Sequence, residues 1–525
     1  MRLFAVLIPV LAALAATPAA AEPPYGHVIR VEASRPAVSD IPLALPAMRQ
    51  APTSSGRSAS SAAEWRRIAD AAVRGGRYAE ASAAYRKEAE IYRRLGDLHA
   101  AHAEEMKAAR WSSEAELYLH RPATSGDARF SGARLEPRLG VLVGAFIDRD
   151  GNLPSYLADG QRYGDVRVFG RKTGKPHASF FMYRAYGQPF PRRWAEYLKR
   201  NGAIPHIAWE PRGLILVRDD AYLRGWVDEV RRLDWPVFIR FAGEMNGDWT
   251  PYHGNPAAYR QAFRMVYQAF RRAPKAAMIW CPNTVPREGI DDYYPGDDAT
   301  DWVGVNFYSV LFQDNDRTRP AEHVHPIDHL EYVYRKYSAR KPIAIGEYAA
   351  THQARLDMRQ RTDFAVSKIA QLYQSLPTRY PRVKLVSWYN SDNIKNARPG
   401  RQLNNYLLTD FSEILMAYRA AIDSPYFLGA EAVRRRESSS VAVERLSEGA
   451  RVGSGPVVEA WVRTYIPSPR VYLMVDGRVL HATRDPFRYR LQLAGLAPGR
   501  HILEVRAYDD EARLAASRRV TIQVP

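Results

Sequence analysis

The sequence predicts an α/β protein built on a (β/α)8 TIM barrel, with a small helical module before the barrel and a β-sandwich after it. Three observations lead to this prediction. Short apolar runs alternate with amphipathic segments across residues 126–425. An Ala-rich segment with helical spacing precedes them, and short alternating strands follow them.

The chain opens with a predicted secretory signal peptide at residues 1–21, where Arg2 precedes an apolar core and a small-residue cleavage site, Ala19-Ala20-Ala21. Residues 22–61 are rich in Pro, Ser and Ala and predict a flexible leader. No later stretch has the roughly twenty apolar residues of a spanning helix. We therefore expect an exported protein, periplasmic or extracellular, with no membrane span.

Residues 62–125 form the predicted helical module, with apolar positions at helical spacing. The turns G-R-Y-A-E-A (76–81) and G-D-L-H-A-A (96–101) resemble the inter-helix turn of tetratricopeptide repeats. Fewer than three repeats seldom stand alone. Two interpretations stay open: a helical hairpin packed on the barrel, and a module that binds a protein partner.

The barrel is predicted from eight apolar runs, each followed by an amphipathic or polar segment. One such segment, 221–233, places Leu223, Trp226, Val227 and Val230 on one face. The predicted strands are residues 140–146, 177–183, 203–211, 237–242, 277–281, 302–307, 342–345 and 384–388.

Residues 426–455 are polar and predict a linker, and residues 456–525 contain short alternating strands with an Asp476-Gly477 hairpin turn. The segment 496–509, L-A-P-G-R-H-I-L-E-V-R-A-Y-D, resembles bacterial immunoglobulin-like modules appended to secreted enzymes. This resemblance implies an immunoglobulin-like β-sandwich that either binds glycan or braces the barrel.

Composition limits the possible partners. The formal net charge is +18, which is compatible with an acidic polymer or with a composition bias. No nucleic-acid-binding motif accompanies it, so we expect no nucleic acid partner. The single cysteine, Cys281, excludes an intramolecular disulfide and is expected to be a buried apolar residue. We expect a monomer.

Two glutamates end predicted barrel strands, and together they suggest glycoside hydrolysis. Glu244 lies where the predicted strand in V-F-I-R-F-A-G-E-M-N-G-D-W (237–249) stops, and Glu347 lies at the end of the predicted strand in K-P-I-A-I-G-E-Y-A-A (341–350). Catalytic groups of such barrels lie at the C-terminal strand ends. One carboxyl can protonate the leaving oxygen while the other attacks the anomeric carbon or activates water.

These segments resemble glycoside hydrolase family 26, the β-mannanases and related retaining endo-glycanases. The strand-four motif R-F-A-G-E-M-N-G-D-W is followed in order by D-W-V-G-V-N-F-Y (301–308) and I-G-E-Y (345–348). The resemblance implies that Glu244 is the acid/base, that Glu347 is the nucleophile, and that Trp249 borders the cleaved linkage. It also implies that Tyr308 bonds the nucleophile.

Further aromatic and polar residues at strand ends complete the predicted substrate-binding set: Arg240, Asn246, Trp249, Trp209, Tyr308 and Trp388. Arg240 is also expected to pair with a nearby carboxylate. Residues 148–152, D-R-D-G-N, lack the spacing of an EF-hand and are assigned to a turn. We expect no metal and no cofactor.

The predicted function is that of an exported retaining endo-glycosidase acting on a β-linked polysaccharide, either mannan-like or an exopolysaccharide. The family carries His immediately before its acid/base Glu, whereas this chain has Gly243. This departure keeps an alternative open: a non-catalytic glycan-binding or scaffold protein of an exopolysaccharide system.

Overall fold

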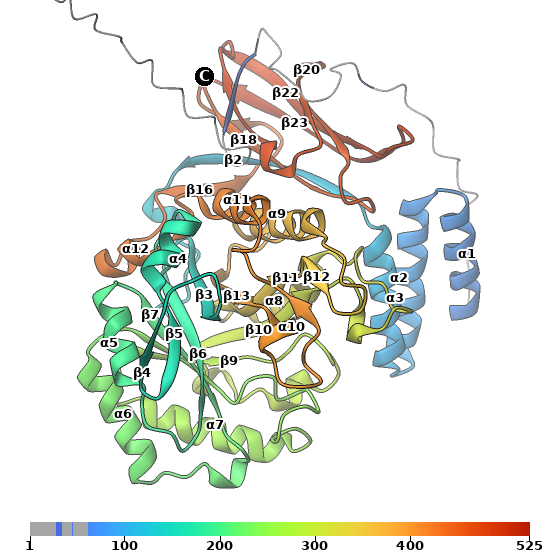
Figure 1. Cartoon of the computed structure of the whole chain (residues 1–525). Coiled ribbons are helices and arrows are strands. Elements are labelled where there is room, and N and C mark those ends of the chain that lie inside the picture. Colours follow the sequence, from blue (N-terminus) through green and yellow to red (C-terminus); the bar gives the residue numbers. More distant parts are fainter. Residues whose placement is uncertain (1–27, 34–44, 46–60) are drawn as a thin grey trace, which may run out of the picture.

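The computed structural model describes residues 28–33, 45 and 61–525 (Figure 1). The predicted signal peptide and most of the predicted leader lie outside the described residues. Within the described part, three helices flank a central barrel, and two β-sheets lie against another side of the barrel (Figure 1).

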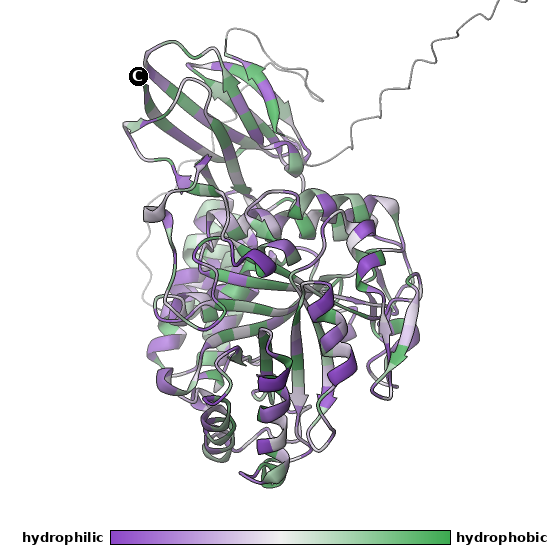
Figure 2. Ribbon diagram, turned by 90° about the vertical axis from the view of Figure 1, so that its left-hand side faces the viewer, coloured by the Kyte–Doolittle hydropathy of each residue, from purple (hydrophilic) through white to green (hydrophobic). Residues whose placement is uncertain are grey.

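The centre of the molecule is a closed barrel of parallel strands, which confirms the predicted fold class for this region. Hydrogen bonding follows the order β3, β6, β7, β8, β9, β10, β11, β13, and β13 pairs with β3 to close the ring. Apolar residues dominate the strands, which are buried on both faces (Figure 2). The strands are β3 Val141–Arg149, β6 Ser179–Ala185, β7 Ile204–Glu210, β8 Val237–Phe241, β9 Ala276–Trp280, β10 Trp302–Ser309, β11 Ile343–Ala350 and β13 Val383–Ser391.

Helices cover the outside of the barrel: α4 Val166–Thr173, α5 Arg192–Arg200, α6 Ala221–Leu233, α7 Pro256–Phe270, α8 Pro326–Tyr337, α9 Thr362–Thr378 and α11 Ser412–Ile422. In α6 the Asp220 side chain accepts a hydrogen bond from Leu223 N at 3.0 Å, and this cap starts the helix. The predicted alternation of strand and helix fails in one place. Between β9 and β10 the chain forms only the 3₁₀ turns η3 Ile290–Tyr293 and η4 Asp297–Ala299, because prolines and glycines interrupt this stretch.

The N-terminal module contains three helices, α1 Ala62–Arg74, α2 Tyr78–Arg94 and α3 Leu98–Trp111, where the sequence predicted a hairpin. Gly76 and Gly96 occupy the two turns with φ of 68° and 81°, a conformation that favours glycine. The likeness to tetratricopeptide repeats stays a prediction. The helices end at Trp111 rather than near residue 125, because the following residues form a strand of the C-terminal sheets.

Two five-stranded sheets form the C-terminal region and share one apolar core. The first has the order β1-β21-β18-β2-β16 and the second β17-β23-β22-β19-β20. The Asp476-Gly477 turn joins β19 to β20, as predicted. Whether the pair is immunoglobulin-like stays a prediction. The strands are β1 Ile29–Glu32, β2 Glu114–Pro122, β16 Val441–Arg445, β17 Ala450–Arg451, β18 Val457–Arg463, β19 Arg470–Val475, β20 Arg478–Thr483, β21 Arg490–Ala494, β22 Gly499–Tyr508 and β23 Leu514–Val524.

The sheets extend beyond the predicted boundaries. β2 comes from the predicted helical module, β1 from the predicted leader, and β16 and β17 from the predicted linker. The linker also holds β15 Phe427–Leu428, which pairs with β3, and α12 Ala430–Arg435. The chain therefore returns to the barrel before it enters the sheets.

Short elements fill the remaining loops: η1 Ser125–Asp127, β4 Ser155–Ala158, β5 Gln161–Gly164, η2 Leu214–Leu216, η5 Gln313–Asn315, β12 Gln353–Ala354, α10 Asn393–Asn396, β14 Asn404–Asn405 and η6 Pro486–Arg488. Side chains fix the sheets to the barrel. Trp461 of β18 donates its indole N–H to Ser375 Oγ of α9 at 2.9 Å, and Arg463 pairs with Asp328 of α8 at 2.7 Å. In the described part of the chain, no helix has the length and apolar character needed to cross a membrane.

Candidate active site

Glu244 lies in a tight turn directly after β8. Ala242 and Glu244 both adopt left-handed backbone conformations, with φ of 47° and 58°. The Glu244 N–H donates to the Cys281 carbonyl at 2.8 Å, and Gly247 N–H donates to the Glu244 carbonyl at 2.9 Å. Such conformations cost about 1–3 kcal/mol each in residues other than glycine and cluster at functional sites. The turn holds Glu244 at the C-terminal end of the barrel strands.

The Glu244 side chain is partly exposed, and within the described part of the chain its hydrogen-bond donors are neutral groups. Oε1 accepts hydrogen bonds from Asn283 Nδ2 at 3.0 Å and from Asn306 Nδ2 at 2.9 Å. Oε2 accepts one from the Trp249 indole at 2.8 Å. These three contacts fix the direction of the carboxyl group.

Glu347 lies within β11, and its side chain is only 5% exposed. Its Oε1 accepts hydrogen bonds from the Tyr183 hydroxyl at 2.6 Å and from the Arg240 guanidinium, and its Oε2 accepts one from the Tyr308 hydroxyl. Burial, and next the negative charge of Glu347, raise the pKa of Tyr183 and of Tyr308 well above the usual value. Both hydroxyls therefore keep the protons that they donate.

Arg240 and Asn306 connect the two carboxyl groups. Arg240 is 1% exposed, its guanidinium lies 5.2 Å from the Phe181 ring centroid, and it donates to Asn306 Oδ1 at 3.3 Å. Asn306 lies opposite Glu347 in the β10–β11 register. Asn306 thus donates a hydrogen bond to Glu244 through its amide N–H group and accepts one from Arg240, which binds Glu347, through its amide oxygen.

Sequence reasoning missed Tyr183, Asn283 and Asn306 as site residues. The sequence did contain a sign that each of them could reach the site. Tyr183 ends a predicted strand, Asn283 follows one, and Asn306 lies in the family-like segment 301–308. A polar residue at the end of an apolar barrel strand is therefore a better indicator than an aromatic residue alone.

Trp209 and Trp388 were predicted to bind sugar, and this prediction is wrong. Both are completely buried. Trp209 stacks on Trp226 of α6 with ring centroids 4.2 Å apart, and Trp388 lies edge-on to Tyr418 of α11 at 5.6 Å. Alternate residues of a strand point to opposite faces, and these two point toward the covering helices.

Asn246 and Arg240 also differ from their predicted substrate-binding role. Asn246 is 1% exposed, and its amide group donates to the carbonyls of Asn283 and Pro286 at 2.9 and 2.6 Å. Its oxygen accepts from Asn283 N–H at 2.9 Å. Asn246 therefore positions a residue that contacts Glu244, while Arg240 contacts Glu347. Trp249 and Tyr308 are partly exposed, and contact with substrate stays a prediction for them.

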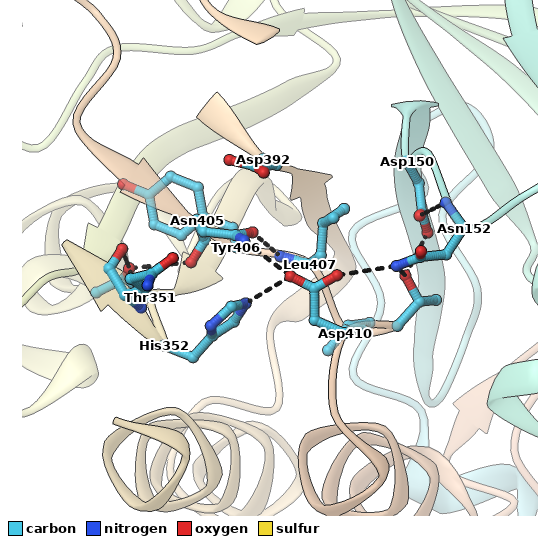
Figure 3. A network of polar contacts seen from close by, with 12 residues as sticks. Asp150, Asn152, Thr351, His352, Asp392, Asn405, Tyr406, Leu407 and Asp410 are labelled. Atoms are coloured by element: carbon cyan, nitrogen blue, oxygen red, sulfur yellow. Dashed lines mark hydrogen bonds and ion pairs between the residues drawn. The ribbon is translucent and has the colours of Figure 1, made fainter. Parts of the chain in front are cut away.

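A polar network joins the loops at the ends of β3, β11 and β13 (Figure 3). Asp410 accepts hydrogen bonds from the side chains of Asn152 and Asn405 at 2.8 Å each and lies 3.4 Å from His352 Nε2. Asp150, in the D-R-D-G-N segment, accepts from Asn390 Nδ2 at 2.7 Å. Asp150 also accepts a hydrogen bond from the Thr409 hydroxyl at 2.8 Å. No cluster of His, Cys, Asp and Glu suited to a metal occurs among residues 28–33, 45 and 61–525.

The structure thus combines a parallel barrel with two carboxyl groups, Glu244 just after β8 and Glu347 within β11, and each is fixed by its own donors. Most glycoside hydrolases use a pair of carboxyl groups that flank the scissile bond. Residues 213–321, which include Arg240, Glu244 and Tyr308, match the family model described as glycosyl hydrolase family 26. This match supports the resemblance to that family and supports a glycoside hydrolase. The matched residues lie within the barrel. The resemblances of the N-terminal helices to tetratricopeptide repeats and of the C-terminal sheets to immunoglobulin-like modules therefore stay predictions.

Parts of the chain also align with known proteins. A β-1,3-xylanase from Alcaligenes sp is 34% identical over 103 residues, 18% of this chain and 21% of the relative. Endoglucanase H from Acetivibrio thermocellus is 25% identical over 306 residues, 54% of this chain and 30% of the relative. The chain thus spans less than a third of the length of either protein. A modular endo-β-1,4-mannanase from Cellulomonas fimi aligns at 14% identity and a TM-score of 0.42, covering 74% of this chain and 94% of that one.

Proposed function

We propose that this chain is an exported retaining endo-glycoside hydrolase that cleaves a β-linked polysaccharide with Glu347 as nucleophile and Glu244 as acid/base. The observation that carries the proposal is the different surroundings of the two carboxyl groups. Glu347 accepts from one cation and two phenols, whereas Glu244 accepts from neutral amide and indole groups only. Export is proposed from the N-terminal segment of the sequence.

In the first step, a Glu347 oxygen attacks the anomeric carbon and forms a glycosyl ester. The glycosidic C–O bond breaks, its electron pair goes to the leaving oxygen, and that oxygen takes the proton of Glu244. Arg240 and the two tyrosine hydroxyls hold the attacking carboxylate in one orientation during this step.

In the second step, water attacks the anomeric carbon and gives a proton to Glu244. The ester bond breaks, and its electron pair returns to Glu347, so the anomeric configuration is retained overall. The amide groups of Asn283 and Asn306 keep Glu244 in place through both proton transfers.

Gly243 is compatible with this proposal, because the three contacts of the Glu244 side chain come from residues 249, 283 and 306. None of them requires a side chain at position 243. The relatives named above suggest the substrates to test first: β-1,3-xylan, β-glucan and β-1,4-mannan.

The test is reducing-end release by the purified mature protein from these three polymers and from acidic polysaccharides. Glu244→Gln and Glu347→Ala serve as parallel variants. Cleavage of one polymer that both substitutions abolish supports the hydrolase. A protein that cuts no polymer but binds one, with equal affinity in wild type and both variants, would instead be the non-catalytic glycan-binding protein.

A further inference from the structure

A third carboxyl group, Glu210, faces the same site. It is the last residue of β7 and lies beside the turn that carries Glu244. Its Oε2 contacts the Tyr252 hydroxyl, which also lies 2.7 Å from the Gly243 carbonyl oxygen. Glu210 Oε1 is different: in the described part of the chain it has no hydrogen-bond partner, and it is not among the fully buried polar atoms.

The contacts of Tyr252 indicate which form of Glu210 is present. A phenol carries one proton, so it cannot donate to an ionised Glu210 and to the Gly243 carbonyl at once. A protonated Glu210 resolves this, since Oε2 then donates to Tyr252 and Tyr252 donates to Gly243. Burial raises the pKa of Glu210 to about 7, which agrees with this arrangement. Oε1 is then a free acceptor.

Gly243 has no side chain beside this acceptor. A Cβ at position 243 would lie 3.7 Å from Glu210 Oε1 and 3.6 Å from the Cys281 carbonyl oxygen, which are ordinary contact distances. The backbone of Gly243 does not have a positive φ. The backbone conformation and the space around the Cβ position would therefore both accept an alanine at position 243. An alanine would also lower the conformational entropy of the unfolded chain, which favours folding.

We propose that Glu210 is a substrate-binding residue of this site, whose Oε1 accepts a hydrogen bond from a hydroxyl of the sugar beside Glu244, next to the backbone of Gly243. This inference rests on the proposed function and adds a specificity-determining contact to it. Glu244 and Glu347 carry out the chemistry, and Glu210 selects a sugar that presents a hydroxyl at this point.

The test compares Glu210→Ala, Gly243→Ala and Tyr252→Phe on the polysaccharide that the wild type cuts. Loss of one hydrogen bond to the substrate should raise KM about tenfold in Glu210→Ala, with kcat changed less than about threefold. Gly243→Ala should raise KM in the same direction, because its methyl group would lie 3.7 Å from Oε1 and would crowd a hydroxyl bound there. Tyr252→Phe is the matched control, because it removes the same internal hydrogen bond but keeps the Glu210 carboxyl group, so its KM should change less than about threefold.

An unchanged KM in Glu210→Ala overturns the proposal, and so does an equal rise in Tyr252→Phe, which would show a structural role. Binding of the same polymers to Glu347→Ala, with and without Glu210→Ala, is measured in parallel by affinity electrophoresis. A protein that cuts nothing, but loses about tenfold in affinity on Glu210→Ala, overturns hydrolysis and supports the contact. A protein that neither cuts nor binds any polymer overturns both.

Discussion

Replacing Arg240 with methionine tests how the barrel accommodates the buried carboxylate of Glu347. The change keeps an apolar chain beside Phe181 but leaves Glu347, whose side chain is 5% exposed, without its cation. Removing one partner of a buried ion pair costs about 3–5 kcal/mol of unfolding free energy. Domains of 150–250 residues shift by about 2–4 °C per kcal/mol, and this barrel is larger, so the unfolding midpoint should fall by roughly 6–10 °C.

The assay is thermal unfolding at pH 7 of Arg240→Met, Glu347→Gln and the double variant. Glu347→Gln alone leaves the Arg240 charge unpaired, whereas the double variant removes both charges. The double variant should therefore be more stable than Arg240→Met, because contacting residues do not behave additively. A fall of less than about 2 °C in Arg240→Met, or a double variant that shows the sum of the two single falls, would refute the reasoning.

Three further predictions follow from the site and its support. Glu244→Gln should lower kcat about 10²–10⁴-fold in reducing-end assays, because the amide cannot donate and recover a proton; a loss below tenfold would exclude Glu244 as acid/base. Trp249→Phe removes the 2.8 Å hydrogen bond to Glu244 and should lower kcat/KM about tenfold, and unchanged kinetics would show that this contact is dispensable. Burial lowers the pKa of His177 to about 4, so between pH 6.5 and 4 the unfolded chain binds a proton that the folded chain does not. The stabilising contribution of neutral His177 is fully present above pH 6.5. Acidification to pH 4 removes it, which lowers the free energy of unfolding by on the order of 3 kcal/mol. His177→Gln should therefore show a smaller fall in unfolding midpoint between pH 7 and pH 4.5, and an equal fall would contradict the assignment.

The barrel was predictable because its signals are local. Each strand is a short apolar run that ends in polar residues, and each can be found without reference to the rest of the chain. Strand β2 had no such advantage, because it pairs with β18 more than 300 positions away, for example Leu119 with Val458. Its residues directly follow a helix-forming segment. Sequence periodicity therefore placed β2 in the helical module, and only long-range pairing assigns it to the sheets.

The sequence suggested Glu244 and Glu347 as candidates for the site, but it could not predict the directions of the surrounding side chains. In strands that are buried on both faces, apolar residues occupy inward and outward positions alike, so the pattern does not identify the face. Trp209 and Trp388 point toward the helices, whereas Tyr183 points toward Glu347. Aromatic residues at strand ends were therefore assigned to the site too freely.

The two carboxyl groups depend on different parts of the barrel. Tyr183 of β6 and Arg240 of β8 hold Glu347, whereas the turn after β8 and the loop after β9 hold Glu244. Asn306 of β10 contacts both sets. A displacement of one strand would therefore change the position of one carboxyl group relative to the other, and Asn306 resists that change. The relative position of the two carboxyl groups thus depends on the closed barrel as a whole, and the polar residues that fix it come from strands that are far apart in sequence.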